Sequence, residues 1–383
     1  MSSDPAALRR LVLQAARDAG ASACAIAAAT PDDATAARFG ASVARGDLAT
    51  WPYDGAYAAR ASDPAATLPG ARSIVCVAVA YATPAPPRRP LRGRVSNYAW
   101  SRDYHARLHA VLAPIARALD EVAGEPCSRV VCDTAPLAER AFAARAGLAW
   151  IGKHTNAIVP GAGSFVFLGE VLATLDIEPD APLKKSCGSC ARCVTACPTG
   201  ALRGDYTIDA SRCISDLTQR TDGIPRALRP LVGEWVWGCD LCQDVCPPTR
   251  RAGTRGAPSF APHGEAAAPD LQALLALRSA GYKRTFRGTA MGWRGAATLR
   301  RNAAVALGNA LDRATVPALG AALHGDPHPQ VRGHAAWALG RVGSPRALAL
   351  LLAASEVEAE DSVRGEIDAA LEPFGNLRGG CGV

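Results

Sequence analysis

The sequence lacks the segments that would place a protein in or across a membrane. No apolar run in its 383 residues reaches the ~18 residues that are needed to cross a bilayer. Residues 1–20 follow an amphipathic helix pattern that contains acidic residues. They have neither the apolar core of a signal peptide nor the acid-poor composition of a transit peptide. We therefore expect a cytoplasmic protein with no membrane partner.

The sequence also lacks the common nucleotide-binding motifs. It contains no P-loop, and no GxGxxG lies between a strand pattern and a helix pattern. The net charge of +7 is a modest excess, which permits an anionic partner but does not demand one. With 49% hydrophobic and 20% charged residues, the chain is a globular protein, long enough for two or three domains.

Cysteine is abundant, and its spacing is the strongest signal. Eight of the 13 cysteines lie between positions 187 and 246. The first group has the CxxCxxCxxxCP spacing of bacterial ferredoxins, and the second, CxxCxxxCP, is one cysteine short. Cys213 lies between them and can supply the missing ligand. The spacing predicts two [4Fe–4S] clusters, the first on Cys187, Cys190, Cys193 and Cys246, the second on Cys239, Cys242, Cys213 and Cys197.

Thiolates bind other metals, and not every cysteine is a ligand. A pair of zinc sites would also use thiolates, but zinc sites seldom have this spacing. The five scattered cysteines are typical of small buried hydrophobic residues. Because a ferredoxin module is much smaller than this chain, we expect the clusters to pass electrons to a second centre in the same protein.

Hydrophobic periodicity predicts the order of the elements. Ala-rich helix patterns cover 5–20, 104–123 and 137–146, and apolar strand patterns cover 73–81, 129–133 and 164–174. These residues indicate an α/β (α+β) domain over 1–180, followed by the ferredoxin-like module over 181–250 and a Gly- and Pro-rich linker over 251–270.

The last part of the chain repeats. Similar helix patterns begin at 299, 331 and 363, which is a period of 32 residues. Such units stack to bury their apolar faces, so we expect HEAT-like helical repeats over 271–383.

The motifs of the first 250 residues resemble those of the epoxyqueuosine reductases. The resemblance is carried by NYAWSRDYH at 97–105, DTAPLAERAFAARAGLAWIGKHTN at 133–156, GSFVFLGE at 163–170 and the cysteine groups. It implies a nitroreductase-like, corrinoid-binding first domain that holds cobalamin. It also implies a tRNA substrate, whose wobble-position epoxyqueuosine is reduced to queuosine with two electrons and two protons.

Asp133 matches the proton donor of that family. At a strand end, beside an apolar corrin face, desolvation would raise the pKa of this carboxyl, so that it holds a proton near pH 7. The alternative is a helix N-cap, because Asp precedes Thr-x-Pro and a helix pattern. Further positions in the family's motifs are expected to line the corrinoid pocket: Ser96, Tyr98, His105, Lys153, His154, Ser215 and Asp240. For His105, Ser215 and Asp240, local hydrogen bonding at a helix start or turn is an equally good explanation.

Residues 271–311 are basic and contain no acid. Interleaved with Tyr282, Phe286 and Trp293, this stretch suits phosphate contact and base stacking, although an ordinary solvated helix face is the alternative. The residues expected to contact tRNA are Lys283, Arg284, Arg287, Arg294, Arg300 and Arg301.

Two other functions remain open at this stage. One is another corrinoid iron–sulfur reductase, such as a reductive dehalogenase; the other is an electron-transfer protein without its own substrate. We expect a monomer that receives electrons from a low-potential donor, which the sequence does not identify.

Overall fold

The computed structural model describes residues 4–254 and 260–377. It forms two compact units, and each is assembled from separate stretches of the chain. Unit 1 contains residues 1–84, 103–213 and 240–261, and unit 2 contains 85–102, 214–239 and 262–383. This spatial grouping differs in kind from the linear domains expected above, whose boundaries stay predictions. Residues 255–259 of the expected linker lie outside the described residues.

Unit 1 is built on a four-stranded antiparallel sheet with the order β1-β2-β7-β4. Its strands are β1 (Ala23–Ala28), β2 (Ser73–Ala80), β7 (Val166–Ala173) and β4 (Ser128–Val131). A small second sheet pairs β5 (Trp150–Ile151) with β6 (Ala157–Ile158). The strand predicted over 73–81 is confirmed, and 164–174 forms one strand. The strand predicted over 129–133 ends two residues earlier than expected.

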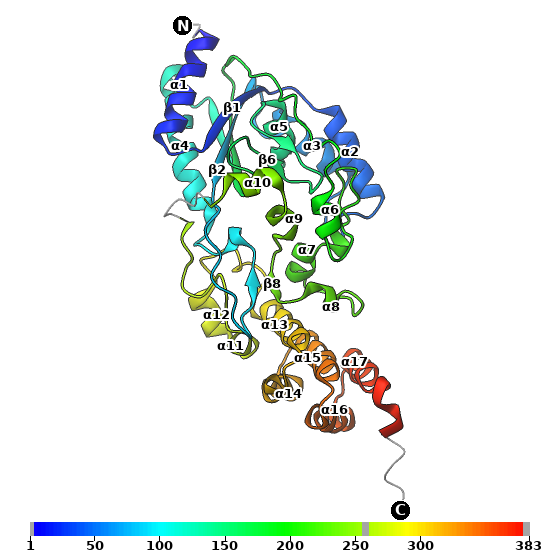
Figure 1. Ribbon diagram of the computed structural model, residues 1–383. Coiled ribbons are helices and arrows are strands. Elements are labelled where there is room, and N and C mark those ends of the chain that lie inside the picture. Colours follow the sequence, from blue (N-terminus) through cyan, green and yellow to red (C-terminus); the bar gives the residue numbers. More distant parts are fainter. Residues whose placement is uncertain (1–3, 255–259, 378–383) are drawn as a thin grey trace, which may run out of the picture. The chain divides into compact units, whose positions relative to one another are not determined.

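Helices cover both faces of this sheet (Figure 1). On one face, α4 (Tyr104–Ala123) packs against β7 and β4 and also contacts α1 (Pro5–Asp18). This contact is close, because a Cβ on Gly169 of β7 would lie 2.7 Å from a methyl group of Leu112. On the other face, α5 (Glu139–Arg145) closes an apolar core around Phe142. The remaining helices of unit 1 are α2 (Asp33–Ala44), α3 (Gly55–Ala61), α6 (Arg192–Ala196), α9 (Leu241–Asp244) and α10 (Pro247–Ala252).

Unit 2 contains the helical repeats. The three predicted repeat helices are confirmed as α13 (Ala296–Ala310), α15 (Pro329–Val342) and α17 (Asp361–Leu371), which pack in succession. Between them lie α14 (Val316–Gly325) and α16 (Pro345–Val357), and α11 (Leu271–Leu275) and α12 (Ser279–Thr285) precede them. The 32-residue period also recurs in ion pairs: Arg300 pairs with Asp326, and Arg332 pairs with Glu358.

Segments from the middle of the chain pack onto the first repeat helix. They are α7 (Ile214–Gln219), α8 (Arg229–Val232) and β8 (Trp235–Trp237), and β8 pairs in parallel with β3 (Arg94–Val95). On α13, the guanidinium of Arg301 donates to the carbonyls of Leu217 and Arg220. The Asn302 amide donates to the carbonyls of Thr218 and Val236. These buried contacts fix α7 and β8 on the repeats.

Candidate functional site

Asp133 lies in a sharp turn two residues beyond the end of β4. Its φ of +58° is in the left-handed region, which costs a non-glycine residue about 1 kcal/mol. Its backbone N–H donates to Oε1 of Glu139 at 2.6 Å. The first residue of α5 is Glu139, and its N-cap is Ala138, so Asp133 is not the cap of that helix. Its carboxyl is left for another role.

The Asp133 carboxyl projects into solvent and contacts the start of α4. Its side chain is 63% exposed, so the protein alone does not desolvate it. The hydroxyl of Tyr104 donates to Oδ2 of Asp133 at 2.7 Å, and the Tyr104 ring stacks on Phe167 of β7 at 4.3 Å between centroids. A rigid aromatic side chain therefore holds one oxygen of the expected proton donor.

His105 is the neighbour of Tyr104 on the same helix turn. Asp103 caps the helix by accepting from the His105 N–H, and it also contacts Nδ1 of the ring at 2.6 Å. The other ring nitrogen, Nε2, is buried without a hydrogen-bond partner among the described residues and lies 3.9 Å from Oδ2 of Asp133. Local hydrogen bonding thus accounts for Nδ1 of this imidazole but leaves Nε2 unexplained.

A second imidazole, His154, is buried in the loop between β5 and β6. Its Nδ1 accepts from the Asn156 N–H at 3.2 Å, which places the proton of the neutral ring on Nε2. Burial and, to a smaller extent, the nearby charge of Arg140 lower the pKa of His154 to about 4, so the ring is neutral at neutral pH. Its Nε2 has no partner in the described part of the chain. A buried N–H donor of this kind is costly unless a bound group accepts from it.

The sequence analysis missed three charged residues at this site. Arg140 donates to the carbonyl of Thr155 at 2.7 Å and so ties α5 to the His154 loop. Glu139 contacts the Asp133 backbone, and Glu170 is fully buried on β7. The signals were present, because Glu139 and Arg140 belong to the quoted 133–156 motif and Glu170 is an acid inside an apolar strand pattern.

The ligands expected for the first cluster converge in unit 1. Burial raises the pKa values of the Cys193 and Cys246 thiols, and nearby thiols raise them further. Cys193 interacts with Cys187 and Cys246, while Cys246 interacts with Cys187 and Cys190. These electrostatic interactions link four thiols from two segments that are more than 50 residues apart in the sequence. Lys153, expected in the corrinoid pocket, donates from Nζ to the Gly188 carbonyl of the same loop at 2.9 Å.

Of the ligands expected for the second cluster, Cys197, Cys213 and Cys242 belong to unit 1 and Cys239 belongs to unit 2. Helices α6 and α9 lie against each other, with Cys197 following α6 and Cys242 on α9. Cys213 and Cys239 are the residues at which the chain passes between the units. No three His, Cys, Asp or Glu side chains in the described ranges are close enough to hold a single metal ion.

The remaining expected pocket residues divide between the units. In unit 1, Asp240 is buried at the N-cap of α9. In unit 2, Trp237 donates from Nε1 to the Tyr98 hydroxyl at 2.9 Å. Gly238 has a φ of +64°, and a Cβ there would lie 2.5 Å from Cβ of the buried Ser96, so only glycine fits.

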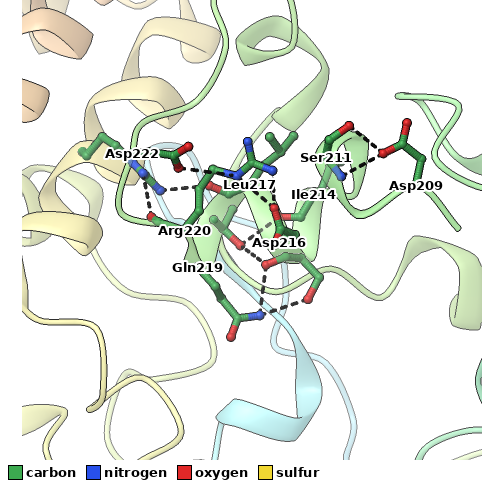
Figure 2. Close-up of polar contacts among 11 residues, drawn as sticks. Asp209, Ser211, Ile214, Asp216, Leu217, Gln219, Arg220 and Asp222 are labelled. Carbon is green, nitrogen blue, oxygen red and sulfur yellow. Dashed lines mark hydrogen bonds and ion pairs between the residues drawn. The ribbon is translucent and has the colours of Figure 1, made fainter. Parts of the chain in front are cut away.

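Ser215 makes the local contacts that were the alternative for it. Its hydroxyl and its carbonyl both accept from the Gln219 amide, at 3.1 and 3.0 Å. The adjacent Asp216 forms a buried ion pair with Arg220, one helical turn away (Figure 2). These contacts at α7 account for Ser215 and Asp216 as residues that stabilise the helix.

The basic stretch of unit 2 needs correction. Arg301 is only 1% exposed and is held by carbonyl groups, so it is not a surface charge, and Arg300 is paired with Asp326. Tyr282 and Phe286 are also buried, so the expectation that they stack on bases is wrong. Lys283, Arg284 and Arg287 are exposed. Trp293 is 51% exposed and lies 3.7 Å from the Arg294 guanidinium.

The class of protein follows from these features and from three matched family models. Residues 186–249 match a 4Fe-4S double cluster binding domain, residues 295–372 match HEAT repeats, and residues 61–134 match the model described as epoxyqueuosine reductase QueG, DUF1730. The chain is thus an iron–sulfur oxidoreductase with a helical repeat region. No described helix is long and apolar enough to cross a membrane.

Similar proteins identify the family. The epoxyqueuosine reductase of Bacillus subtilis is 36% identical over 81% of each chain, and that of Escherichia coli is 38% identical over 71% of this chain and 73% of its own. A crystal structure of a selenomethionine-labelled epoxyqueuosine reductase superposes with a TM-score of 0.89 at 33% identity, covering 96% of this chain and 98% of that one. A second crystal structure of such an enzyme, with an epoxyqueuosine-modified stem loop of tyrosine tRNA, has a TM-score of 0.88 with the same identity and coverage. This chain belongs to the epoxyqueuosine reductase family.

Proposed function

We propose that this chain reduces epoxyqueuosine to queuosine at the wobble position of tRNA, with cobalamin and two [4Fe–4S] clusters. The observation that carries the proposal is the placement of Asp133, an exposed carboxyl held by Tyr104. It lies 3.9 Å from Nε2 of His105, a buried nitrogen without a hydrogen-bond partner among the described residues. The relation to epoxyqueuosine reductases, one of them in complex with a modified tRNA stem loop, supplies the substrate.

Unit 1 offers groups that fit a corrinoid. Buried nitrogens without partners among the described residues are His105 Nε2, His154 Nε2 and Trp150 Nε1, and corrin rings carry amide side chains that can pair with them. We assign His105, Lys153, His154 and Asp240 of unit 1 to holding the cofactor. Ser96, Tyr98 and Ser215 belong to unit 2, and their role in the pocket stays a prediction from the sequence. When bound, cobalamin supplies the low-potential two-electron chemistry that an epoxide requires.

Asp133 supplies the proton. An epoxide oxygen leaves readily only when it is protonated, and two electrons with two protons convert the epoxide into an alkene and water. A bound corrin face would cover the exposed carboxyl and desolvate it, which favours its protonated form. In one structure of the Bacillus subtilis enzyme, the loop of the catalytic aspartate is swung out of the active site, and the Asp133 turn of this chain is suited to the same role.

The proposed tRNA surface consists of Lys283, Arg284, Arg287, Arg294 and Trp293. Lys283, Arg284 and Arg287 are exposed cations that suit phosphate contact, and the exposed indole of Trp293 suits stacking on an unpaired base. Arg294 is partly buried and lies against that indole. Because Arg300 and Arg301 are used inside unit 2, we leave them out of this surface.

A deoxygenation assay tests the proposed function. Anaerobically purified protein, with clusters and cobalamin reconstituted, receives a strong reductant and epoxyqueuosine-bearing tRNA, and mass spectrometry follows loss of one oxygen from the nucleoside. We expect conversion by the native protein and a loss of about 100-fold or more in Asp133→Asn. Unchanged conversion in the variant would remove Asp133 from the reaction. No conversion by fully loaded native protein would overturn the proposed activity.

A further inference from the structure

Two carboxyl side chains lie beneath the Asp133 turn. Glu170 is 0% exposed in the central strand β7, where its register partners are Cys76 of β2 and Val131 of β4. It faces the same side of the sheet as Leu168 and Leu172, toward the apolar core that α5 closes. A charged carboxylate in this position would lose its hydration without a compensating cation, so it is expected to be neutral or hydrogen-bonded.

The hydrogen bond that Glu170 makes requires a proton. As a carboxylate, neither of its oxygens has a partner in the described ranges. Burial, and then the neighbouring carboxyl of Glu139, raise the pKa of Glu170. A protonated Glu170 can donate to that carboxyl, so one proton would replace repulsion between the buried Glu170 and the partly buried Glu139 with a hydrogen bond.

Glu139 also forms a hydrogen bond to the turn that contains Asp133. Its Oε1 accepts from the backbone N–H of Asp133 at 2.6 Å, and it begins α5, which packs on the sheet that contains Glu170. Glu139 thus links the backbone of a residue with a φ of +58° to the helix that packs on the sheet. A backbone in this conformation persists only when its surroundings fix it.

We propose that Glu170 and Glu139 are positioning residues, whose shared proton latches the Asp133 turn onto the sheet and holds the Asp133 carboxyl in its working orientation. The latch is a property of unit 1 and rests on the contacts given above. Its importance for turnover rests on the proposed role of Asp133.

The electrostatic surroundings support a retained proton. Burial raises the pKa of Glu139 to about 7 and that of Glu170 well above its usual range, so the pair keeps at least one proton at neutral pH. The only cation among the causes of these shifts is Arg140, and it acts on Glu139. Other titratable and charged groups surround the pair or its neighbours. From the sheet and the turn after it come Cys76, Cys132 and Asp133. From the helices and loops come Tyr57 on α3, Arg140 and Arg145 on α5, Asp103, Tyr104 and His105 at the start of α4, and His154.

Two substitutions of Glu170 separate the latch from simple packing. In Glu170→Gln the amide donates to Glu139 at every pH, so the latch should remain but no longer titrate. In Glu170→Leu the size of the side chain is nearly kept and the donor is lost. Glu139→Ala removes the acceptor at the partly exposed end of the latch.

The first readout is amide hydrogen exchange of residues 130–138 in the cluster-loaded protein without tRNA. We expect native-like protection in Glu170→Gln and exchange about tenfold faster or more in Glu170→Leu and Glu139→Ala. Circular dichroism and iron content establish that each variant is folded. Should Glu170→Leu not fold, Glu139→Ala decides the outcome.

The second readout is the pH profile of kcat. The native enzyme should lose activity at high pH as the pair loses its last proton, whereas Glu170→Gln should lose less over the same range. Unchanged exchange in folded Glu139→Ala, or exchange in Glu170→Gln as fast as in Glu170→Leu, would overturn the latch. Because exchange is measured without turnover, a native protein that shows the latch but converts no epoxyqueuosine would overturn only the proposed function.

Discussion

The backbone N–H of Asp133 and the carboxyl of Glu139 are joined by a hydrogen bond of 2.6 Å, six residues apart across the turn that follows β4. This contact uses only the backbone of Asp133, and the hydroxyl of Tyr104 on α4 holds one oxygen of its carboxyl. The expected proton donor is thus placed by its backbone and by a neighbouring hydroxyl. The side chain itself remains open to a substrate or cofactor.

Tyr104→Phe tests the hydroxyl that contacts Asp133. Removing it takes away one hydrogen bond to a carboxyl, and such bonds contribute about 1.5–3 kcal/mol. Because the Asp133 carboxyl is exposed, we expect the low end of that range, about a tenfold fall in kcat with little change in KM for tRNA. Tyr206→Phe, which changes an exposed tyrosine of the same unit, is the matched control. An undiminished kcat in Tyr104→Phe would contradict a role for this contact.

Cysteine substitutions test the two ligand sets. Two cubanes contain about eight iron and eight sulfide ions per chain. Cys193→Ala and Cys246→Ala should each lose the same cluster, which leaves about four of each by metal and sulfide analysis. Cys24→Ala, outside the motifs, should retain both clusters. Different residual spectra for Cys193→Ala and Cys246→Ala would show that the two residues do not share a cluster.

Charge substitutions test the tRNA surface of unit 2. Replacing Lys283, Arg284 and Arg287 with Ala should weaken tRNA binding and reduce the slope of log affinity against log salt by about one unit per cation. Arg346→Ala, an exposed arginine on α16, is the control. Equal salt slopes for the triple variant and this control would place the tRNA elsewhere.

Arg301→Met should behave differently from these surface variants. Its guanidinium is buried against the carbonyls of Leu217 and Arg220, which would lose their donors. We expect a loss of stability of about 2–4 kcal/mol, measured as a lower Tm, without a change in the salt slope of binding. A weaker salt dependence at unchanged Tm would restore Arg301 to the tRNA surface.

The acid pair should also make stability depend on pH. The folded state raises the pKa of Glu139 from its ordinary 4.5 to about 7, and it raises that of Glu170 as well. An acid with a raised pKa stabilises the folded state fully below its unfolded pKa, and this contribution is lost as the pH rises through the folded value. We therefore expect the native Tm to fall between about pH 5 and pH 8 more steeply than that of Glu170→Gln. Parallel curves would show that the pair does not retain its proton.

The sequence was informative wherever chemistry depends on spacing along the chain. The CxxCxxCxxxCP group and its shorter copy predicted the double cluster domain, because ligands on one short loop must follow the geometry of the cubane. The 32-residue period predicted the repeat helices, because each unit must present the same apolar face to the next. The motifs at 97–105 and 133–156 indicated the family.

Sequence reasoning was weakest where position in space decides the role of a residue. The sequence does not distinguish the basic residues of the run, which include Lys283, Arg284, Arg300 and Arg301. In the structure Arg301 is buried and Arg300 is paired with Asp326, because the repeat helix turns these two inward. The same limit hid Glu170, since only the pairing of β7 with β2 and β4 shows that this acid has no access to water.

The sequence by itself determined the double cluster domain, the repeats and the family of this protein, since each depends on a local pattern that can be recognised without knowledge of the fold. Only the tertiary structure decided that Asp133 is not a helix cap and that Glu139 and Glu170 lie together beneath it. The physical reason is that burial and hydrogen bonding between distant segments depend on how the strands pair. Glu139 and Glu170 are 31 positions apart in the sequence, yet each affects the pKa of the other in the folded protein.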